Sequence, residues 1–117
     1  MYRSLAAKEV STVAFLIFGT GALLGTAGGA TKAEAQRRGA AVYAQNCARC
    51  HGIDGRAQTH KGRQVDAVDF TSDDWTPDMA HDIRIVTNGK KSMPAFGRKL
   101  TSAQINAVVQ YIRRFKG

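Results

Sequence analysis

The feature that most constrains this chain is the short stretch that contains its two cysteines. Cys47 and Cys50 are separated by two residues, and His51 follows directly. This C-x-x-C-H spacing is typical of covalent haem attachment. Two thiols on one turn of backbone can reach vinyl groups on the same edge of a porphyrin, and the imidazole that follows can bind the iron. The motif therefore predicts thioether bonds at both cysteines and an iron ligand at His51.

Other uses of two cysteines fit this sequence less well. A disulfide between Cys47 and Cys50 would close only a tiny loop. A structural zinc site needs four nitrogen or sulfur ligands in paired clusters, and only His60 and His81 remain to complete one. A thioredoxin-like dithiol lies at a strand-to-helix junction of a βαβ unit, and no part of the sequence indicates a parallel sheet.

The first 35 residues have the charged, apolar and small-residue order of a secretory signal. Arg3 and Lys8 precede an apolar run over residues 13–24. Residues 33–35 read Ala-Glu-Ala, which is a cleavage site of the A-x-A type, and small residues further upstream offer others. We therefore expect a signal peptide over residues 1–35 and a single domain over residues 36–117.

The alternative for this leader is an uncleaved membrane anchor. Residues 13–30 make a stretch of about 18 residues, which is near the lower limit for crossing a bilayer. Several glycines in it disfavour a helix, so cleavage is the preferred interpretation. Both possibilities place the domain outside the cytoplasm, and we expect it in the periplasm.

The domain itself is predicted to be helical. A first helix over about residues 33–46 leads into the cysteine motif, and Gly39 in its middle indicates a close approach by another backbone. The stretch from Gly52 to Val65 is polar and has no clear period, so it is predicted to be an irregular loop.

Two further helices follow this loop. One is predicted to begin with Thr76 as its N-cap and Pro77 in its first turn, and to end at residues 88–89, which are Asn-Gly. The last helix begins at a capping box formed by Thr101 and Gln104. Its apolar residues recur at helical spacing through Ile112.

These segments together resemble the class I c-type cytochromes over about residues 36–115. The resemblance rests on the C-x-x-C-H motif and on Met-Pro-Ala-Phe at residues 93–96. It implies an all-α cytochrome c-like fold with three to four helices around one covalently attached haem c, with His51 and Met93 as the axial iron ligands. It also implies that Gly39 and Tyr43 lie where the first helix crosses the last.

The sequence departs from that family after His51. The family often has a proline whose carbonyl accepts a hydrogen bond from the axial imidazole, and this chain has no proline between His51 and Trp75. The group that orients His51 is therefore left open by the sequence.

Other side chains compete with Met93 for the sixth iron position. Met79 lies on the apolar stripe of a predicted helix, where methionine usually fills the core. His60 or His81 would give bis-histidine ligation and a lower reduction potential. Met93 precedes Pro94, so the backbone cannot be helical there and the thioether is presented from a loop. A thioether is a soft ligand that favours ferrous iron. Its position and its motif together make Met93 the preferred ligand.

The domain is strongly basic. From residue 36 onward there are fourteen Lys and Arg against seven Asp and Glu. Four basic residues flank Met93, where an exposed haem edge is expected: Lys90, Lys91, Arg98 and Lys99. Such a ring would steer acidic redox partners. Nucleic acid is a poor alternative, because no basic helix carries interleaved aromatic residues.

The predicted function is that of a monomeric one-electron carrier between redox proteins, and not an enzyme, because no nucleophile with a base and no catalytic metal cluster is evident. One alternative is a haem-based gas sensor or small peroxidase with a labile sixth ligand. Another is the cytochrome subunit of a larger oxidoreductase, for which a retained membrane anchor would be evidence.

Overall fold

The computed structural model describes residues 28–117. The elements in this part of the chain are α1 (Lys32–Asn46), α2 (Ala48–His51), α3 (His60–Val65), α4 (Met79–Asn88), α5 (Ser102–Ile112) and the 3-10 helix η1 (Arg113–Lys116). The predicted all-α class is confirmed. This range contains more helices than the three or four predicted, since α2 and α3, which are only four and six residues long, were not predicted as helices. The apolar run over residues 13–24 lies outside the described residues.

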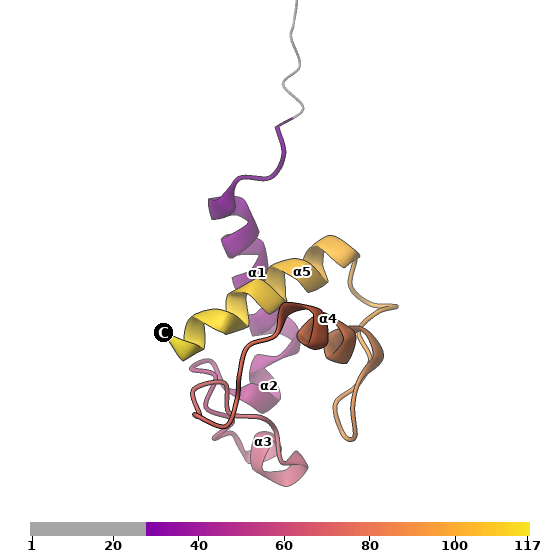
Figure 1. Cartoon of the computed structure of the whole chain (residues 1–117). Helices are drawn as coiled ribbons and strands as arrows, with labels where there is room; N and C mark the ends of the chain where they lie inside the picture. Colours follow the sequence, from indigo (N-terminus) through magenta and orange to yellow (C-terminus); the bar gives the residue numbers. More distant parts are fainter. Residues whose placement is uncertain (1–27) are drawn as a thin grey trace, which may run out of the picture.

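Helices α1 and α5 cross each other, and α2, α3 and α4 lie below the crossing in this view (Figure 1). Gly39 makes this crossing possible. A Cβ atom there would clash with the backbone carbonyl oxygen of Ala107 and lie 2.9 Å from Cβ of Tyr111. One turn further along α1, the ring of Tyr43 packs on that of Tyr111, with centroids 5.3 Å apart. The predicted crossing at Gly39 and Tyr43 is confirmed.

The first turn of α1 is fixed by a capping box. The Thr31 hydroxyl accepts a hydrogen bond from the Glu34 amide at 3.2 Å, and the Glu34 carboxylate accepts one from the Thr31 amide at 3.3 Å. Helix α1 thus begins at Lys32, and the predicted boundary between residues 35 and 36 would cut its first turn. That boundary stays a prediction.

The stretch from Gly52 to Val65 is not wholly irregular, and on this point the sequence prediction was wrong. Its second half forms α3, whose N-cap is Thr59, with its side chain accepting from the Gly62 amide at 2.8 Å. The Thr59 hydroxyl also donates to the Cys50 carbonyl at 3.0 Å, which joins α3 to α2. A helix of six residues held by a cap and by backbone packing needs no apolar stripe, and so it left no periodic signal.

The predicted start of the second long helix was also placed too early. The N-cap of α4 is Asp78 and not Thr76, because the Asp78 carboxylate accepts from the His81 amide at 2.9 Å. Helix α4 ends at Asn88 before Gly89, as predicted. The capping box of α5, between Thr101 and Gln104, is confirmed.

The core lies between α1, α4 and α5 and the loops that connect them. Its most completely buried side chains are Tyr43, Val108 and Val109. Loop residues complete it: Phe70 from the segment after α3, and Phe96 and Leu100 from the segment before α5. Residues from both long loops are therefore held in place by the same core as the helices.

Candidate haem-binding site

The cysteine motif consists of Cys47, which lies between α1 and α2, and of α2 itself. Cys47 ends α1 and begins α2, and its carbonyl accepts hydrogen bonds from the Cys50 amide at 3.1 Å and the His51 amide at 3.0 Å. Both cysteines are partly buried free thiols. The turn holds the two thiols three positions apart on one backbone helix, which is the arrangement that the motif predicts.

The imidazole of His51 has a fixed orientation. Its Nδ1 lies 2.9 Å from the carbonyl oxygen of Val68. Since a carbonyl oxygen only accepts, Nδ1 carries the proton and donates, and Nε2 carries the free lone pair. Burial lowers the pKa of His51 below its ordinary value of 6.5, against the opposing effect of the Val68 hydrogen bond. His51 is therefore a neutral imidazole with one nitrogen available as a ligand.

Val68 is the functional residue that the sequence did not reveal. It lies 17 positions after His51 in a loop without regular structure, and its half-exposed side chain plays no part in the hydrogen bond. Every residue has a carbonyl, so no residue type marks the acceptor. Because the proline that often supplies this carbonyl is absent here, the sequence did not indicate which residue is the acceptor.

The thiol of Cys47 is in its uncharged form at neutral pH. Burial, with a smaller contribution from the neighbouring Cys50, raises the pKa of Cys47 to about 11. Among residues 28–117 there is no group of three or more His, Cys, Asp or Glu side chains that could hold a metal ion.

Met93 lies on a short hairpin-like loop between α4 and α5. The Lys90 amide donates to the Met93 carbonyl at 3.1 Å, and the Met93 amide donates to the Lys90 carbonyl at 2.9 Å. Three and four residues further on, the Phe96 and Gly97 amides donate to α4 carbonyls at 2.9 and 3.0 Å. The Met93 side chain is partly buried and packs against the core, as does Cys47.

The competing ligands have other surroundings. His60 at the start of α3 and His81 on α4 are exposed. Met79 is partly buried and packs against the core, as expected of a helix-stripe methionine.

The described residues fit a haem c. The site offers two reduced thiols on one turn, a neutral imidazole with a free Nε2, and a thioether on a fastened loop. These are the donors that c-type attachment and axial ligation require. The helices and the donor set define a class I c-type cytochrome.

Comparison with known proteins gives the particular family. Residues 34–112 match the family described as "Cytochrome C oxidase, cbb3-type, subunit III", and the chain belongs to it. Cytochrome c6 of Picosynechococcus sp. is 34% identical over 90% of this chain and 92% of its own length. The cbb3-type cytochrome c oxidase subunit CcoP of Azospirillum brasilense is 32% identical over 74% of this chain, which spans only 30% of that subunit.

A solved structure agrees with the c-type cytochrome fold. The KustC0563 c-type cytochrome superimposes with a TM-score of 0.62 and 32% identity, over 68% of this chain and 98% of its own. The predicted cofactor, one covalently attached haem c, is confirmed by this membership. Within residues 28–117, no helix has the length and hydropathy needed to cross a membrane.

Proposed function

We propose that this c-type cytochrome is a periplasmic one-electron carrier between redox proteins and is not itself an enzyme. In this proposal Cys47 and Cys50 form the thioether bonds, and His51 and Met93 are the two axial ligands. The observation that carries it is the 2.9 Å contact between His51 Nδ1 and the Val68 carbonyl, which leaves Nε2 as the only ligand atom of that ring.

The bound haem supplies one-electron iron chemistry, and the chain's residues set the conditions for it. If His51 and Met93 both held the iron, no position would be left for a substrate, and the group would supply one-electron transfer alone. A thioether together with an imidazole would give a higher reduction potential than two imidazoles. The buried Phe70 ring stacks on the His51 ring and shields it from water.

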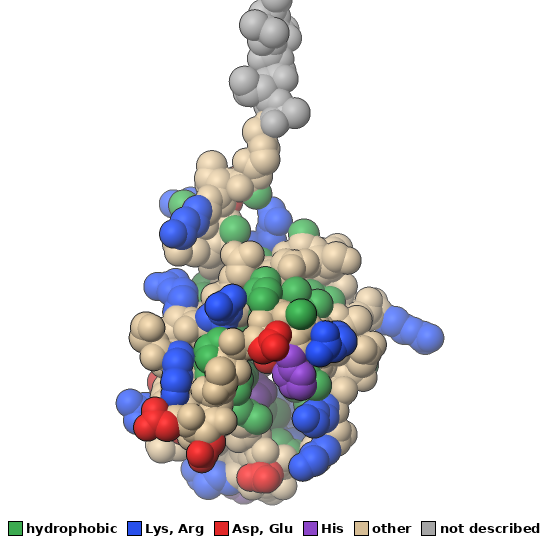
Figure 2. Space-filling model, viewed as in Figure 1, with side chains coloured by type: hydrophobic (Ala, Val, Ile, Leu, Met, Phe, Trp, Pro, Cys, Tyr) green, Lys and Arg blue, Asp and Glu red, His purple; other side chains and the backbone are tan. Residues whose placement is uncertain are grey.

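The charge around the Met93 loop supports docking of acidic partners. Lys90, Lys91, Arg98 and Lys99 are all exposed. Figure 2 shows Lys and Arg side chains spread over one face of the molecule, with hydrophobic side chains, some acidic side chains and histidine between them. Exposed basic side chains beside Met93 would speed the encounter with an acidic partner.

The experiment that tests the axial ligands compares two methionine variants of the holoprotein. Met93→Leu should open the sixth position, so that carbon monoxide shifts the visible spectrum of the reduced protein. Met79→Leu removes a partly buried methionine from α4 and should leave the spectrum insensitive to carbon monoxide, as in the unaltered protein. Covalent haem is checked by its persistence on the denatured chain.

A carbon monoxide shift in the unaltered protein would contradict this ligation. The site would then have a labile sixth position, and the gas-sensor or peroxidase alternative would replace the carrier. If Met79→Leu responded and Met93→Leu did not, Met79 would be the ligand.

A second candidate is a subunit of a larger oxidoreductase, and the family match is the observation that favours it. The same iron ligands serve both functions, so the two are distinguished by identifying the proteins that bind this chain. We expect the exported protein to migrate as a monomer in size-exclusion chromatography. Stable co-purification with terminal oxidase subunits from native membranes would instead favour the subunit.

A further inference from the structure

The carbonyl that orients His51 belongs to a stretch of loop without a proline, since the nearest one, Pro77, lies nine residues after Val68. Residues 66–78 lie between α3 and α4 in turns and extended backbone. The peptide that joins Val68 to Asp69 presents the carbonyl oxygen to His51 Nδ1. An unrestrained loop peptide rotates readily, so the precise direction of this hydrogen bond needs some other restraint.

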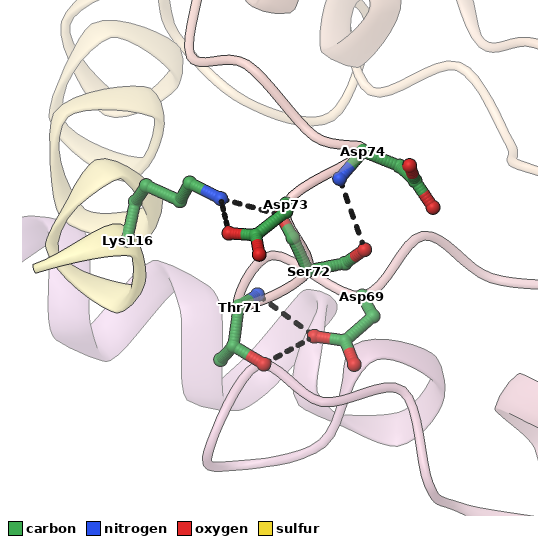
Figure 3. Close-up of polar contacts among 6 residues, drawn as sticks. All are labelled: Asp69, Thr71, Ser72, Asp73, Asp74 and Lys116. Atoms are coloured by element: carbon green, nitrogen blue, oxygen red, sulfur yellow. Dashed lines mark hydrogen bonds and ion pairs between the residues drawn. The ribbon is translucent and has the colours of Figure 1, made fainter.

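Asp69 supplies a restraint directly at that peptide. Its Oδ1 accepts two hydrogen bonds of 2.7 Å, from the backbone amide and from the hydroxyl of Thr71 (Figure 3). This Asx turn fixes the backbone on the C-terminal side of the Val68 carbonyl. These two bonds hold the Asp69 carboxylate ionised, and they lower its pKa below the ordinary value of 3.8.

The next residue holds the same segment against the imidazole. The Phe70 amide donates to the Gly55 carbonyl at 2.8 Å. The Phe70 ring stacks on the His51 ring, with centroids 4.5 Å apart and planes 17° from parallel. The loop therefore meets His51 twice, through a carbonyl on the ring edge and through an aromatic ring on its face.

The far end of the turn is tied to the C-terminus. Lys116 of η1 donates from Nζ to the Ser72 carbonyl at 2.6 Å and to the Asp73 carboxylate at 3.2 Å (Figure 3). The Asp74 carboxylate, also on this loop, makes no hydrogen bond or ion pair among the described residues, and only its backbone amide donates, to the Ser72 hydroxyl at 3.2 Å. The side-chain contacts of this turn thus come from Asp69, Ser72 and Asp73, and not from Asp74.

We propose that Asp69 is a positioning residue for His51, which holds the Val68 carbonyl in line with the Nδ1–H bond. This inference rests on the proposed role of His51 as an iron ligand. A well-aligned acceptor makes an imidazole more basic, and a more basic ligand stabilises ferric iron. Releasing the turn weakens that donation and raises the reduction potential.

The test is the midpoint potential of spectrally intact holoprotein variants. Asp69→Ala removes the turn, while Asp69→Asn keeps an Oδ1 that accepts both Thr71 bonds. Asp74→Ala removes the same charge from the same loop without breaking a side-chain contact. We expect the potential to rise in Asp69→Ala by up to about 59 mV, a tenfold change in a one-electron equilibrium, and to rise much less in the other two.

A second variant covers the case in which Asp69→Ala does not mature. Thr71→Val removes one of the two Asp69 hydrogen bonds without changing charge or shape, and it should raise the potential by a smaller amount. In the double variant Val68→Pro with Asp69→Ala, proline restrains the backbone in place of the turn and should return the potential toward its original value. The Val68 amide donates no hydrogen bond among the described residues, so proline removes none of those described.

The proposal is overturned if Asp69→Ala, Asp69→Asn and Asp74→Ala have the same potential, or if Thr71→Val has no effect. It is also overturned if these variants lose stability in urea with unchanged potentials, which would make the turn merely structural. Failure of the underlying ligation looks different, because a carbon monoxide response would then be present in the unaltered protein.

Discussion

The hydroxyl of Tyr43 on α1 donates a buried hydrogen bond of 2.6 Å to the carbonyl oxygen of Gly52, the residue that follows His51. This bond joins the helix before the cysteine motif to the backbone directly after it. Burial is the main reason that the pKa of Tyr43 lies above its ordinary value of 10.0, so the hydroxyl remains a donor well into the alkaline range. This bond thereby restrains the turn that carries both thiols and the imidazole.

Tyr43→Phe should destabilise the holoprotein by about 0.5–1.5 kcal/mol, because it removes the shorter of the two hydrogen bonds to the Gly52 carbonyl and leaves only the one from the Gly55 amide at 3.2 Å. Urea unfolding at neutral pH measures this loss. Tyr111→Phe is the matched control, since the Tyr111 hydroxyl makes no hydrogen bond among the described residues and should change little. Equal effects of the two variants would show that the bond to Gly52 contributes nothing to stability.

Gly39→Ala should destabilise the domain by about 1–3 kcal/mol or more, because the new methyl group would meet the Ala107 carbonyl on α5. The clash outweighs the gain of about 1 kcal/mol that alanine normally brings to a helix interior. Thermal unfolding of this variant beside the unaltered protein tests this, and a stabilised Gly39→Ala would contradict the close crossing.

Asp82→Asn should stabilise the protein near pH 7 and lose this advantage near pH 3. Burial of Asp82 on α4 raises its pKa above the ordinary value of 3.8, and the Asp78 carboxylate adds to this rise. The hydrogen bond from the Asp78 amide and the charges of His81 and Arg113 act in the opposite direction but do not cancel it. The folded state therefore disfavours the ionised carboxylate at neutral pH.

The sign follows from proton linkage. As pH falls through the raised folded value, the folded state takes up a proton before the unfolded state, so the penalty shrinks and is gone below 3.8. The asparagine variant has no such penalty at any pH and can still accept from the Asp78 amide. Urea unfolding of both proteins at the two pH values checks this, and a difference independent of pH would contradict it.

Lys90→Glu should slow oxidation of the reduced protein by the anion ferricyanide. Reversing one exposed charge near the Met93 loop is worth roughly 1 kcal/mol or less in water, so we expect about a two- to fivefold decrease at low salt. The difference should shrink as salt rises, because charges are screened over about 8 Å at physiological ionic strength. Arg37→Glu on α1 makes the same charge change elsewhere, and an equal decrease there would show that only net charge matters.

The sequence predicted best those parts whose signal is local. Thr101 and Gln104 lie three residues apart, and their capping box follows from that spacing alone. Gly39 and Tyr43 needed the resemblance to a known family, because their partners on α5 are far away in the sequence. The site residues Cys47, Cys50, His51 and Met93 lie in short motifs and remain predictions as ligands.

The misjudged parts depend on competition or on distant backbone. Thr76 and Asp78 are both good caps, and only the chain direction set by packing decides that Asp78 accepts from His81. Helix α3 depends on Thr59 meeting carbonyls of α2. The Val68 carbonyl meets His51 only after the chain has folded, and no property of the valine side chain announces it.

The fastening of the Met93 loop bears on the speed of electron exchange. Backbone bonds tie this loop to itself through Lys90 and to α4 through Phe96 and Gly97. In the proposed role, the sulfur of Met93 is then held in nearly one place whether the centre is oxidised or reduced. Little atomic rearrangement would then accompany the change of charge, so the reorganisation energy would be small and electron transfer would be fast.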